Sequence, residues 1–429
     1  MINEPTWKYV REHLGGDVRT LALHGCKDDA VDMTMALQQI DGHQRALRKL
    51  PSWAATEGVV YPPRINMEQC SGELAARHKA KIIGTGAAGA LIDLTGGLGV
   101  DFTFMCDVFK EAVYVERDAR LCAVATHNLR VLGKRNTTTV CSDARDYLAT
   151  IPPQADTQGR HTVIYLDPSR RDTHGRRTYA LADCTPDVAD MMPALLLRAD
   201  MVMLKLSPML DWRKAVADLS PHTVHEVHIV SVDNECKELL LLLRSRAAFA
   251  PHPLLTCSDI CSADGSCLDY SPGMANSAPA AAASTAPPHA IAAATAPPPA
   301  IAAAGRTPLP AFLYEPNAAV MKAGCYSQVA SDFGVSQIAP NSHLYVSDRA
   351  VPTFPGRRFR IADASTMNRR ELSRSVGRLK RANISVRNFP LGAEQLRQRL
   401  GIADGGTDHI FATTLADGTH ILLLCQRDR

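Results

Sequence analysis

A glycine-rich stretch after a short apolar run carries the residues best suited to ligand chemistry. The run ends at Asp93, the glycines follow in Thr95-Gly96-Gly97-Leu98-Gly99, and a segment at Phe102 can open a helix. Glycine lets the backbone turn tightly and approach a ligand closely, and the first N–H groups of a helix are free to bind that ligand. Leu91–Asp101 therefore predicts the strand, turn and helix that begin a doubly wound α/β domain.

A second glycine cluster lies just upstream. Gly84-Thr85-Gly86-Ala87-Ala88-Gly89 matches the dinucleotide-binding pattern G-x-G-x-x-G, which is meaningful only where it follows a strand and opens a helix. Here the cluster follows a helical stretch and precedes the expected strand Ala90–Leu94. We interpret it as a flexible link between that helix and that strand.

Acidic residues end the first four expected strands, at the edge where doubly wound folds bind ligands. They are Asp93, Glu116, Asp143 and Asp167. An acid after the second strand can hold ribose hydroxyls, but a dinucleotide enzyme uses the same arrangement. The carboxylate at Asp93 discriminates better, because it opposes the pyrophosphate that a dinucleotide places at the glycine turn. It suits S-adenosylmethionine, which has no phosphate and carries a sulfonium and an ammonium.

These residues resemble the signature strand ends of class I S-adenosylmethionine-dependent methyltransferases, over about residues 87–257. The resemblance implies an α/β fold with a Rossmann-like seven-stranded sheet, and S-adenosylmethionine as the cofactor. It places the glycine turn beneath the cofactor, Glu116 on the ribose and Asp143 near the adenine amine. The predicted cofactor-binding residues are Asp93, Thr95, Gly96, Gly97, Gly99, Asp101, Glu116, Arg117, Asp143 and Ala144.

Short apolar segments alternate with helical ones from Ala90 onward, which predicts a mainly parallel sheet covered on both faces. A leucine-rich segment, Glu235–Arg244, is expected to be helical. The expected strands are residues 90–94, 112–115, 137–141, 163–166, 201–206 and 227–232, with a seventh at 253–257.

The first 83 or so residues are expected to be helical, because apolar residues recur at helical spacing between Gly and Pro breaks. A single helix is expected from Met67 to about Ile83, with Asn66 as its N-cap. This N-terminal region either caps the next domain or closes over the cofactor or substrate, and the sequence leaves both readings open.

The composition limits the class of protein. With 429 residues and 46% hydrophobic residues, the chain should form several globular domains. Its 12 cysteines show no regular pairing, which suits a reducing compartment, and Cys257, Cys261 and Cys267 lack the C-x-x-C arms of a metal site. The start of the chain has no apolar signal-peptide core, and the longest apolar run, Leu239–Leu243, is too short for a membrane span. The sequence predicts a cytoplasmic protein with neither a metal nor a membrane partner.

Further motifs extend the resemblance to nearly the whole chain. They are Met67-Glu68-Gln69-Cys70-Ser71, Asp167-Pro168-Ser169-Arg170-Arg171, Lys205-Leu206-Ser207-Pro208, Asn234-Glu235-Cys236-Lys237-Glu238-Leu239, Tyr314-Glu315-Pro316-Asn317, Lys322-Ala323-Gly324, Arg387-Asn388-Phe389-Pro390, Gly405-Gly406 and Phe411-Ala412-Thr413. These motifs resemble bacterial methyltransferases with a small ferredoxin-like module and a THUMP-like C-terminal domain. True THUMP domains accompany RNA-modifying enzymes, chiefly those acting on tRNA, so the resemblance implies an RNA substrate. Gly72 and Leu74-Ala75 depart from the expected Ser and Thr-Ala.

A tract of Ala and Pro at residues 275–305 separates two parts of the chain, and it looks like an insertion relative to the family. Such a tract cannot bury enough surface to fold and should form an extended linker. The predicted parts are an N-terminal helical region (1–85), a methyltransferase domain (86–270), the linker (271–306), a ferredoxin-like module (307–358) and a basic THUMP-like domain (359–429).

Basic residues concentrate near the C-terminal end. Residues 356–399 hold twelve Lys and Arg against three Asp and Glu, in a chain whose net charge is only +3. Leu372, Val376 and Leu379 form an apolar stripe at helical spacing, so the arginines around them would face outward. A solvated helix face is one interpretation, and a surface that contacts RNA phosphates is the one we favour. The predicted RNA contacts are Arg374, Arg378, Lys380 and Arg381.

The segment after the fourth strand is the expected site of methyl transfer. Amino-methyltransferases place Asp/Asn-Pro-Pro-aromatic there to hold an exocyclic amine, and Asp167-Pro168-Ser169 keeps only the first half of that motif. The resemblance implies that Asp167, with Pro168 and Ser169, orients the acceptor. The remaining predicted substrate residues are Arg170, Arg171, Lys205 and Ser207. Ion pairing with neighbouring acids is the open alternative for the two arginines, although arginine forks suit phosphates and bases.

The chemistry of the acceptor follows from what the site lacks. A nitrogen acceptor needs no general base, because proximity to the electrophilic methyl supplies much of the rate. A carbon acceptor needs a cysteine nucleophile, and no cysteine ends a strand beside Asp167. The sequence predicts methylation of a base nitrogen in tRNA or rRNA. The alternatives are a small-molecule or protein acceptor, or an RNA-binding protein without catalysis.

Overall fold

The computed structural model describes residues 2–84, 89–154, 161–169, 181, 184–219, 224–244, 252–273 and 309–428. The chain divides into two compact units. The first consists of Met1–Val232, Lys237–Leu254 and Ile260–Gly265, and the second of Asp233–Cys236, Leu255–Asp259 and Ser266–Arg429. Across the described ranges, no helix has both the length and the apolar character needed to cross a membrane.

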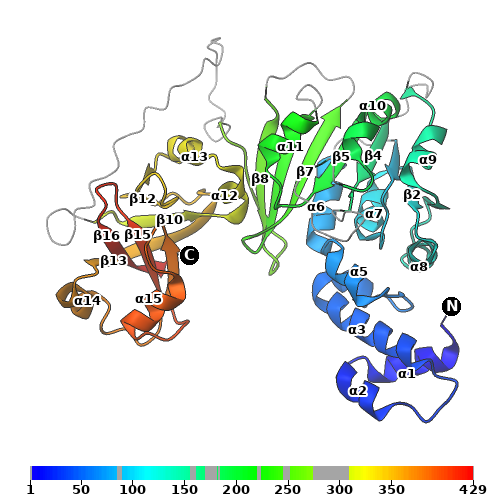
Figure 1. Cartoon of the computed structure of the whole chain (residues 1–429), viewed down its shortest axis with the longest axis horizontal. Coiled ribbons are helices and arrows are strands. Elements are labelled where there is room, and N and C mark those ends of the chain that lie inside the picture. Colours follow the sequence, from blue (N-terminus) through cyan, green and yellow to red (C-terminus); the bar gives the residue numbers. More distant parts are fainter. Residues whose placement is uncertain are drawn as a thin grey trace. The chain divides into compact units, whose positions relative to one another are not determined.

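The first unit begins with the expected helical region (Figure 1). Asn3, Asp17 and Asp32 cap its first three helices, each accepting a backbone N–H three residues on. Val10 and Ile40 are buried where the first and third helices pack together. The helices are α1 (Glu4–His13), α2 (Val18–His24), α3 (Met33–Lys49) and α4 (Pro51–Ala54).

The single helix expected from residue 67 to residue 83 is in fact two helices, α5 (Arg64–Gln69) and α6 (Glu73–Ile83). The predicted N-cap Asn66 lies inside α5. Cys70 and Gly72 are extended between the two helices, and the break lets Ser71 turn its hydroxyl to Asp101 at 2.8 Å. The prediction was wrong because helical periodicity continues across a kink that a distant side-chain contact stabilises.

The sheet of the methyltransferase region confirms the predicted Rossmann-like α/β class. The first five strands run parallel, and β7 pairs antiparallel with β5. Its strand order is β3-β2-β1-β4-β5-β7-β6-β8-β9, so it has nine strands where seven were expected. The strands are β1 (Ala90–Asp93), β2 (Glu111–Glu116), β3 (Thr137–Cys141), β4 (Thr162–Leu166), β5 (Met201–Leu206), β6 (Val224–Val232), β7 (Glu235–Arg244), β8 (Leu254–Ile260) and β9 (Cys267–Tyr270).

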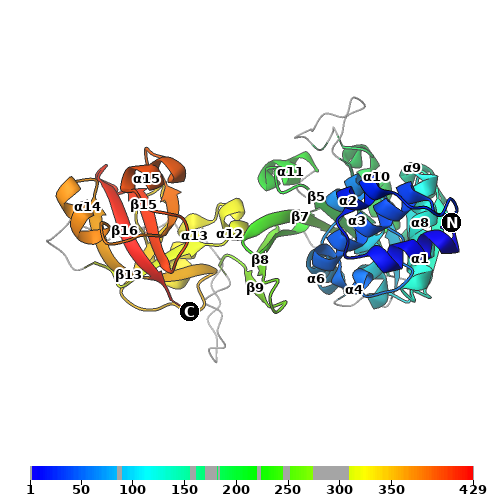
Figure 2. The same cartoon turned by 90° about the horizontal axis from the view of Figure 1, so that it is seen from below.

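Helices connect the first six of these strands, as the alternating pattern predicts (Figures 1 and 2). Leu91 of β1 and Val163 of β4 are completely buried, which fits parallel strands covered on both faces. The connecting helices are α7 (Val100–Met105), the 3-10 turn η1 (Cys106–Val108), α8 (Ala119–Val131), α9 (Ala144–Thr150), α10 (Val188–Arg198) and α11 (Trp212–Asp218).

The leucine-rich segment Glu235–Arg244 is strand β7, not the expected helix. Asp233 and Asn234 both have positive φ angles, 49° and 63°, the conformation of a two-residue hairpin turn between β6 and β7. Leu239–Leu243 are at most 1% exposed. A strand buried on both faces shows no alternation between polar and apolar residues, so its sequence reads like a buried helix.

The second unit contains one seven-stranded sheet of order β11-β12-β10-β13-β16-β15-β14. The long strand β13 pairs with β10 on one side and with β16 on the other, so the boundary predicted at residue 358 falls inside a strand. The strands are β10 (Phe312–Pro316), β11 (Ser336–Gln337), β12 (Tyr345–Ser347), β13 (Gly356–Thr366), β14 (Asn383–Arg387), β15 (Asp408–Thr414) and β16 (His420–Arg427). The helices are α12 (Ala318–Ala323), α13 (Tyr326–Phe333), α14 (Arg369–Ser375) and α15 (Ala393–Leu400).

The apolar stripe near the C-terminal end faces the core, as expected. Val376 is buried in the cluster that also contacts Leu372 and Leu379. Helix α14 ends at Ser375, however, so the later part of the stripe belongs to the loop before β14.

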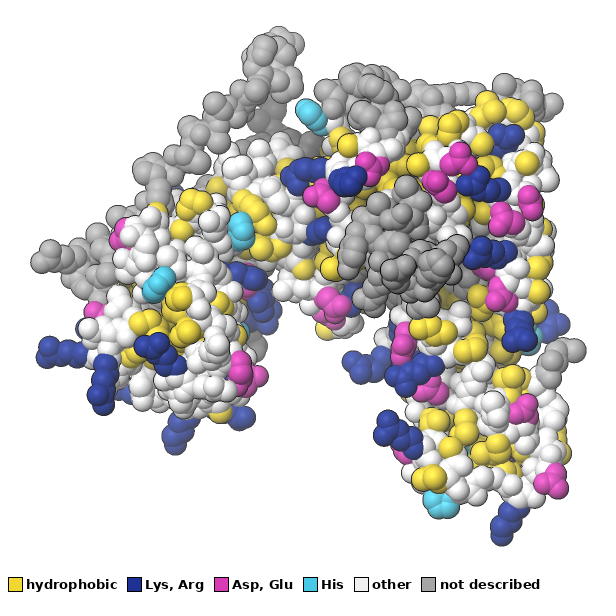
Figure 3. All heavy atoms as spheres, viewed as in Figure 1, with side chains coloured by type: hydrophobic (Ala, Val, Ile, Leu, Met, Phe, Trp, Pro, Cys, Tyr) yellow, Lys and Arg dark blue, Asp and Glu magenta, His cyan; other side chains and the backbone are white. Residues whose placement is uncertain are grey.

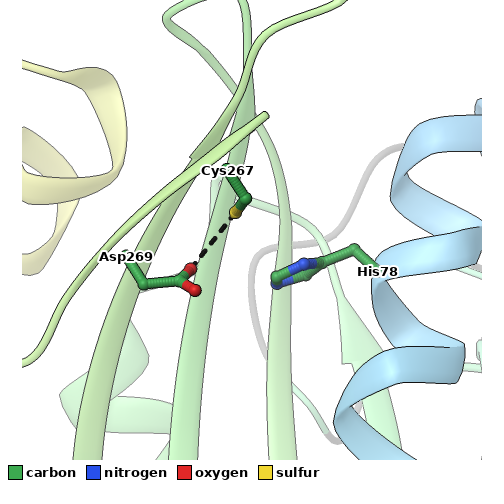
Figure 4. A group of neighbouring side chains, drawn as sticks. All are labelled: His78, Cys267 and Asp269. Carbon is green, nitrogen blue, oxygen red and sulfur yellow. Dashed lines mark hydrogen bonds between the residues drawn. The ribbon is translucent and has the colours of Figure 1, made fainter. Parts of the chain in front are cut away.

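Two predicted segments fall largely outside the described residues. They are most of the Ala/Pro linker and residues 85–88 of the glycine link. Cys267, one of the three neighbouring cysteines, donates a hydrogen bond to Asp269 at 3.2 Å (Figure 4).

Candidate active site

The glycine turn after β1 packs against a tyrosine of β2. A Cβ on Gly96 would lie 2.1 Å from the Tyr114 ring, so only glycine fits there. The Tyr114 hydroxyl donates to the Gly97 carbonyl at 2.5 Å, and the Gly97 N–H donates to Glu116 at 2.8 Å. Gly97 and Gly99 both have positive φ. The turn, predicted to lie under the cofactor, and Glu116, predicted to hold the ribose, therefore form one hydrogen-bonded group.

A chain of contacts joins the ends of β1 and β4. Buried Asp93 accepts the Thr95 N–H at 2.9 Å, and the Thr95 hydroxyl oxygen accepts the Asp167 N–H at 2.6 Å. Burial raises the pKa of Asp93 well above its usual range; the Thr95 N–H opposes this, and the Asp101, Asp167 and Glu116 carboxylates add to it. A bound cation would relieve that repulsion. These carboxylates therefore fit a cofactor that carries an ammonium and a sulfonium.

The end of β3 completes the same edge. Ser142 donates its N–H to the Glu116 carbonyl at 3.1 Å, which places Asp143 beside the end of β2. Asp143 caps α9 by accepting the Arg145 N–H at 2.9 Å. The other predicted cofactor residues here differ in exposure, since Arg117 is exposed and Ala144 is buried.

Lys205 of β5 contacts the candidate catalytic acid directly. Its Nζ lies 2.5 Å from Asp167 Oδ2 and 3.7 Å from Asp101 Oδ2. Burial alone would lower the pKa of Lys205, but the Asp167, Asp101 and Glu238 carboxylates raise it, so the ammonium stays charged. Burial raises the pKa of Asp167, and Lys205 opposes that shift. Lys205, predicted from sequence to contact substrate, is thus engaged by acids of the chain itself.

A buried ionic cluster lies behind this pair. Lys79 of α6 is fully buried and pairs with Asp101, at 3.0 Å, and with Glu238. The Ser71 hydroxyl lies 2.8 Å from Asp101 and 3.0 Å from Glu238, and the Tyr165 hydroxyl donates to Asp101 at 2.7 Å. Although burial opposes it, Lys79 and Lys205 lower the pKa of Asp101 to about 2. Asp101, predicted to contact the cofactor, therefore accepts hydrogen bonds from Ser71 and Tyr165 through Oδ2 and forms an ion pair with Lys79 through Oδ1.

Sequence reasoning missed the roles of Lys79, Tyr165 and Glu238. A signal was present, because Ser71 and Glu238 belong to two of the motifs that carry the family resemblance, and these motifs meet in the cluster. The Asp167 and Lys205 motifs meet in the same way. The sequence did not reveal that these distant motifs contact one another in the fold.

The segment after Asp167 is held by its backbone. Ser169 exchanges two hydrogen bonds of 2.9 Å with Thr185, while its side chain is exposed and Pro168 is buried. Ser207, predicted to contact substrate, is buried and accepts the Met209 N–H at 3.1 Å. Arg170 and Arg171 lie outside the described residues.

The predicted RNA contacts lie in the second unit. All four are exposed: Arg374, Arg378, Lys380 and Arg381. Lys and Arg side chains project from this C-terminal part of the chain in the space-filling view (Figure 3).

Comparisons with known proteins agree with these features. A ferredoxin-like domain model matches residues 312–355, and a THUMP domain-like model matches residues 356–427. Proteins from two Mycobacterium tuberculosis strains, CDC 1551 / Oshkosh and H37Rv, are each named an uncharacterized S-adenosylmethionine-dependent methyltransferase. Each is 23% identical over 356 residues, which span 82% of this chain and 84% of the relative.

A solved structure extends the likeness to the whole chain. The crystal structure of a provisionally assigned methyltransferase from Porphyromonas gingivalis W83 has a TM-score of 0.79 and 28% identity, with both chains covered completely. The predicted enzyme class, cofactor and C-terminal domains are confirmed. The chain is an S-adenosylmethionine-dependent methyltransferase with ferredoxin-like and THUMP-like domains at its C-terminal end.

Proposed function

We propose that this enzyme methylates a nitrogen of a base in tRNA or rRNA, and that its basic THUMP-like domain binds the RNA. The observation that carries the proposal is the placement of Asp167. Its N–H is fixed on Thr95 of the glycine turn, and its carboxylate is held by Lys205. An acid anchored beside a cofactor turn can hold an acceptor in line with a methyl group, which is the main requirement of such a transfer.

The strand ends supply the cofactor contacts in this proposal. Asp93 attracts the positive charge of S-adenosylmethionine, the glycine turn passes beneath the cofactor, and Glu116 and Asp143 hold the ribose and the adenine amine. When bound, the cofactor supplies the electrophilic methyl group. Because Glu116 already accepts the Gly97 and Asp118 N–H groups, its carboxylate is held in place before any ligand arrives.

Asp167 accepts a hydrogen bond from the acceptor amine, and the exposed side chain of Ser169 lies on the same segment. Among the described cysteines, Cys70 interacts electrostatically with both Asp101 and Lys205. Its thiol donates to the Met67 carbonyl at 3.3 Å, and burial raises its pKa. A thiol that resists ionisation is a poor nucleophile, so the site favours a nitrogen acceptor over a carbon acceptor that requires thiolate attack.

The RNA part of the proposal rests on charge and on domain type. Residues 356–427 match a THUMP-like model, and residues 356–399 carry nine more basic than acidic residues. Arginine and lysine side chains exposed on one domain are the usual means of holding phosphates.

The test is transfer of labelled methyl from S-adenosylmethionine to total RNA from a strain that lacks this protein. Label in a discrete, nuclease-sensitive tRNA or rRNA fraction, recovered on a methylated nitrogen, is the expected result. The Asp167→Ala variant, which removes the hydrogen-bond acceptor, should keep cofactor binding and lose about a hundredfold in transfer rate because the acceptor is no longer positioned. Label that enters only protein or small molecules would contradict the RNA proposal.

A further inference from the structure

The hydroxyl of Thr95 joins two parts of the candidate active site that are 72 residues apart in the sequence. Thr95 belongs to the glycine turn after β1, and its side-chain oxygen accepts the N–H of Asp167, which follows β4, at 2.6 Å. One side chain therefore links the cofactor turn to the segment that is proposed to hold the methyl acceptor.

The backbone on either side of Thr95 is fixed to neighbouring strands. The Leu94 N–H donates to the Tyr165 carbonyl of β4 at 3.1 Å, and the Gly96 N–H donates to the Val115 carbonyl of β2 at 2.9 Å. Threonine is branched at Cβ and has a restricted χ1 angle. A fixed backbone therefore also restricts the position of the Thr95 hydroxyl, which is ready to accept the Asp167 N–H.

Asp167 is held at two points. Its N–H donates to Thr95, and its Oδ2 lies 2.5 Å from Lys205 Nζ. The Asp167 side chain is nevertheless partly exposed, so it can contact a bound methyl acceptor. The direction in which Asp167 presents its carboxylate depends on both of these anchors, and one of them belongs to the cofactor turn.

The Thr95 hydroxyl also has a proton to donate. A hydroxyl offers one donor and two acceptor lone pairs, and the Asp167 N–H uses one of the lone pairs. In the part of the chain that the structure describes, no group accepts the hydroxyl proton. Thr95 is half-buried at the edge of the sheet where the cofactor is proposed to bind, so this proton is available to a ligand there.

The neighbouring Asp93 indicates which part of the cofactor lies near this hydroxyl. Thr95 donates its N–H to Asp93 at 2.9 Å, and the Asp93 carboxylate suits the ammonium of the cofactor. S-adenosylmethionine carries that ammonium and a carboxylate on the same carbon atom. An acid beside a hydroxyl therefore complements this amino-acid group, because the acid binds the cation and the hydroxyl can donate to the anion.

We propose that Thr95 is a positioning residue whose hydroxyl donates to the carboxylate of bound S-adenosylmethionine while it holds the Asp167 N–H. Hydrogen bonds in a chain polarise one another, so donation to an anion makes the hydroxyl oxygen a stronger acceptor. Thr95 thus orders the Asp167 segment when the cofactor site is filled, and by linkage the affinity for the methyl acceptor rises. The inference rests on the proposed role of Asp167 and on no particular methyl acceptor.

The first experiment uses calorimetry to compare two ligands on the full-length protein. They are S-adenosylmethionine and its decarboxylated form, which keeps the ammonium and the sulfonium but lacks the carboxylate. Thr95→Val, which loses only the hydroxyl, should weaken binding of S-adenosylmethionine about tenfold and change binding of the decarboxylated form little. Thr95→Ser keeps a hydroxyl and should retain most of the affinity. Equal weakening for both ligands in Thr95→Val would overturn the carboxylate contact.

The second experiment measures amide hydrogen exchange in the peptide that contains Asp167. In the unmodified protein and in Thr95→Ser, S-adenosylmethionine should slow this exchange more than the decarboxylated form does, whereas in Thr95→Val exchange should be fast with either ligand. Thr126→Val is the matched control, because the Thr126 hydroxyl donates to the Cys122 carbonyl within α8 at 2.7 Å, outside the cofactor turn.

Equal protection of Asp167 by the two ligands in the unmodified protein would overturn the coupling, and this comparison does not require any variant to fold. Neither experiment contains RNA. A failure to methylate RNA would therefore count against the proposed function alone, whereas equal protection would count against the coupling alone.

Discussion

The methyltransferase core and the C-terminal domain both contain networks of ion pairs, but acids outnumber bases in the first and bases outnumber acids in the second. In the core, three carboxylates share two lysines, with Lys79 and Lys205 facing Asp101, Asp167 and Glu238. In the C-terminal domain, four arginines share the two acids Glu315 and Asp428. The first arrangement leaves an excess of negative charge and the second an excess of positive charge.

This difference matches the ligands that the two regions are proposed to bind. A cofactor with a sulfonium and an ammonium favours an acidic site, whereas an RNA backbone favours a basic one. Burial differs as well, since Lys79 is fully buried while the Arg360 side chain is 65% exposed. Pairing in the core should therefore determine stability and the position of reacting groups, and pairing in the C-terminal domain should mainly hold cations ready for phosphate.

The largest expected effect comes from the buried lysine. Lys79→Met leaves Asp101 and Glu238 without their shared cation, and loss of one partner of a buried pair costs about 3–5 kcal/mol. The free energy of unfolding, measured with urea on the full chain, should fall by that amount. Lys81→Met, an exposed change on the same helix, is the control and should change it little.

A double variant sharpens this prediction. Lys79→Met with Glu238→Gln removes one charge of each sign, so it should recover part of the lost stability. Equal destabilisation by Lys79→Met and Lys81→Met would show that the buried cluster does not contribute as described.

The pH dependence of methyl transfer tests the Lys205–Asp167 pair. Burial raises the pKa of Asp167 and Lys205 opposes that shift, so Lys205→Met should raise that pKa further. If the carboxylate form is the active one, the acid limb of the rate profile moves to higher pH. Lys205→Arg keeps the charge and should leave the limb near its original position. An unshifted limb in Lys205→Met would exclude this positioning role.

Cofactor affinity should also depend on pH through Asp93. Burial raises the pKa of Asp93, and a bound cation favours its carboxylate form, so affinity for S-adenosylmethionine should increase as pH rises through that pKa. Asp93→Asn should bind about tenfold more weakly and show a flatter pH dependence by calorimetry. The same raised pKa makes the contribution of Asp93 to folding stability disappear as pH rises through it, and the asparagine variant should lack that loss. A pH dependence unchanged in Asp93→Asn would assign the proton to another group.

The smallest expected effect lies in the C-terminal domain. Arg360→Ala removes an exposed partner of Asp428 and leaves Arg358 in place, so the free energy of unfolding should change by less than about 1 kcal/mol. A loss as large as that of Lys79→Met would remove the contrast between the two regions.

Much of the fold was predictable from local patterns. The expected strand Met201–Leu206 agrees residue for residue with β5, because short apolar runs between helices have few alternatives. The buried run in β7 was misassigned because its environment, two covered faces, is set by other strands. The glycine turn could be predicted because the spacing of its residues is local. Each acid at a strand end could be predicted for the same reason.

The ionic cluster was not predictable by the same means. Lys79 and Glu238 are 159 residues apart, and nothing in either local sequence indicates an ion pair. From sequence alone, a lysine in a helix is expected to be exposed to solvent. Only the fold shows that Lys79 is buried beside its acidic partners. Long-range charge pairing therefore required the structure, whereas strand-end acids did not.

The most direct test compares two variants in one methyl-transfer assay with RNA from a strain lacking the protein. Asp167→Ala should reduce kcat about a hundredfold with unchanged RNA affinity. Arg374→Ala combined with Arg378→Ala should raise KM for RNA about tenfold and leave kcat nearly unchanged. Separate effects of this kind would support a core that performs the transfer and a basic domain that holds the RNA. If the arginine variant leaves KM for RNA unchanged, or if Asp167→Ala retains full kcat, the account is wrong.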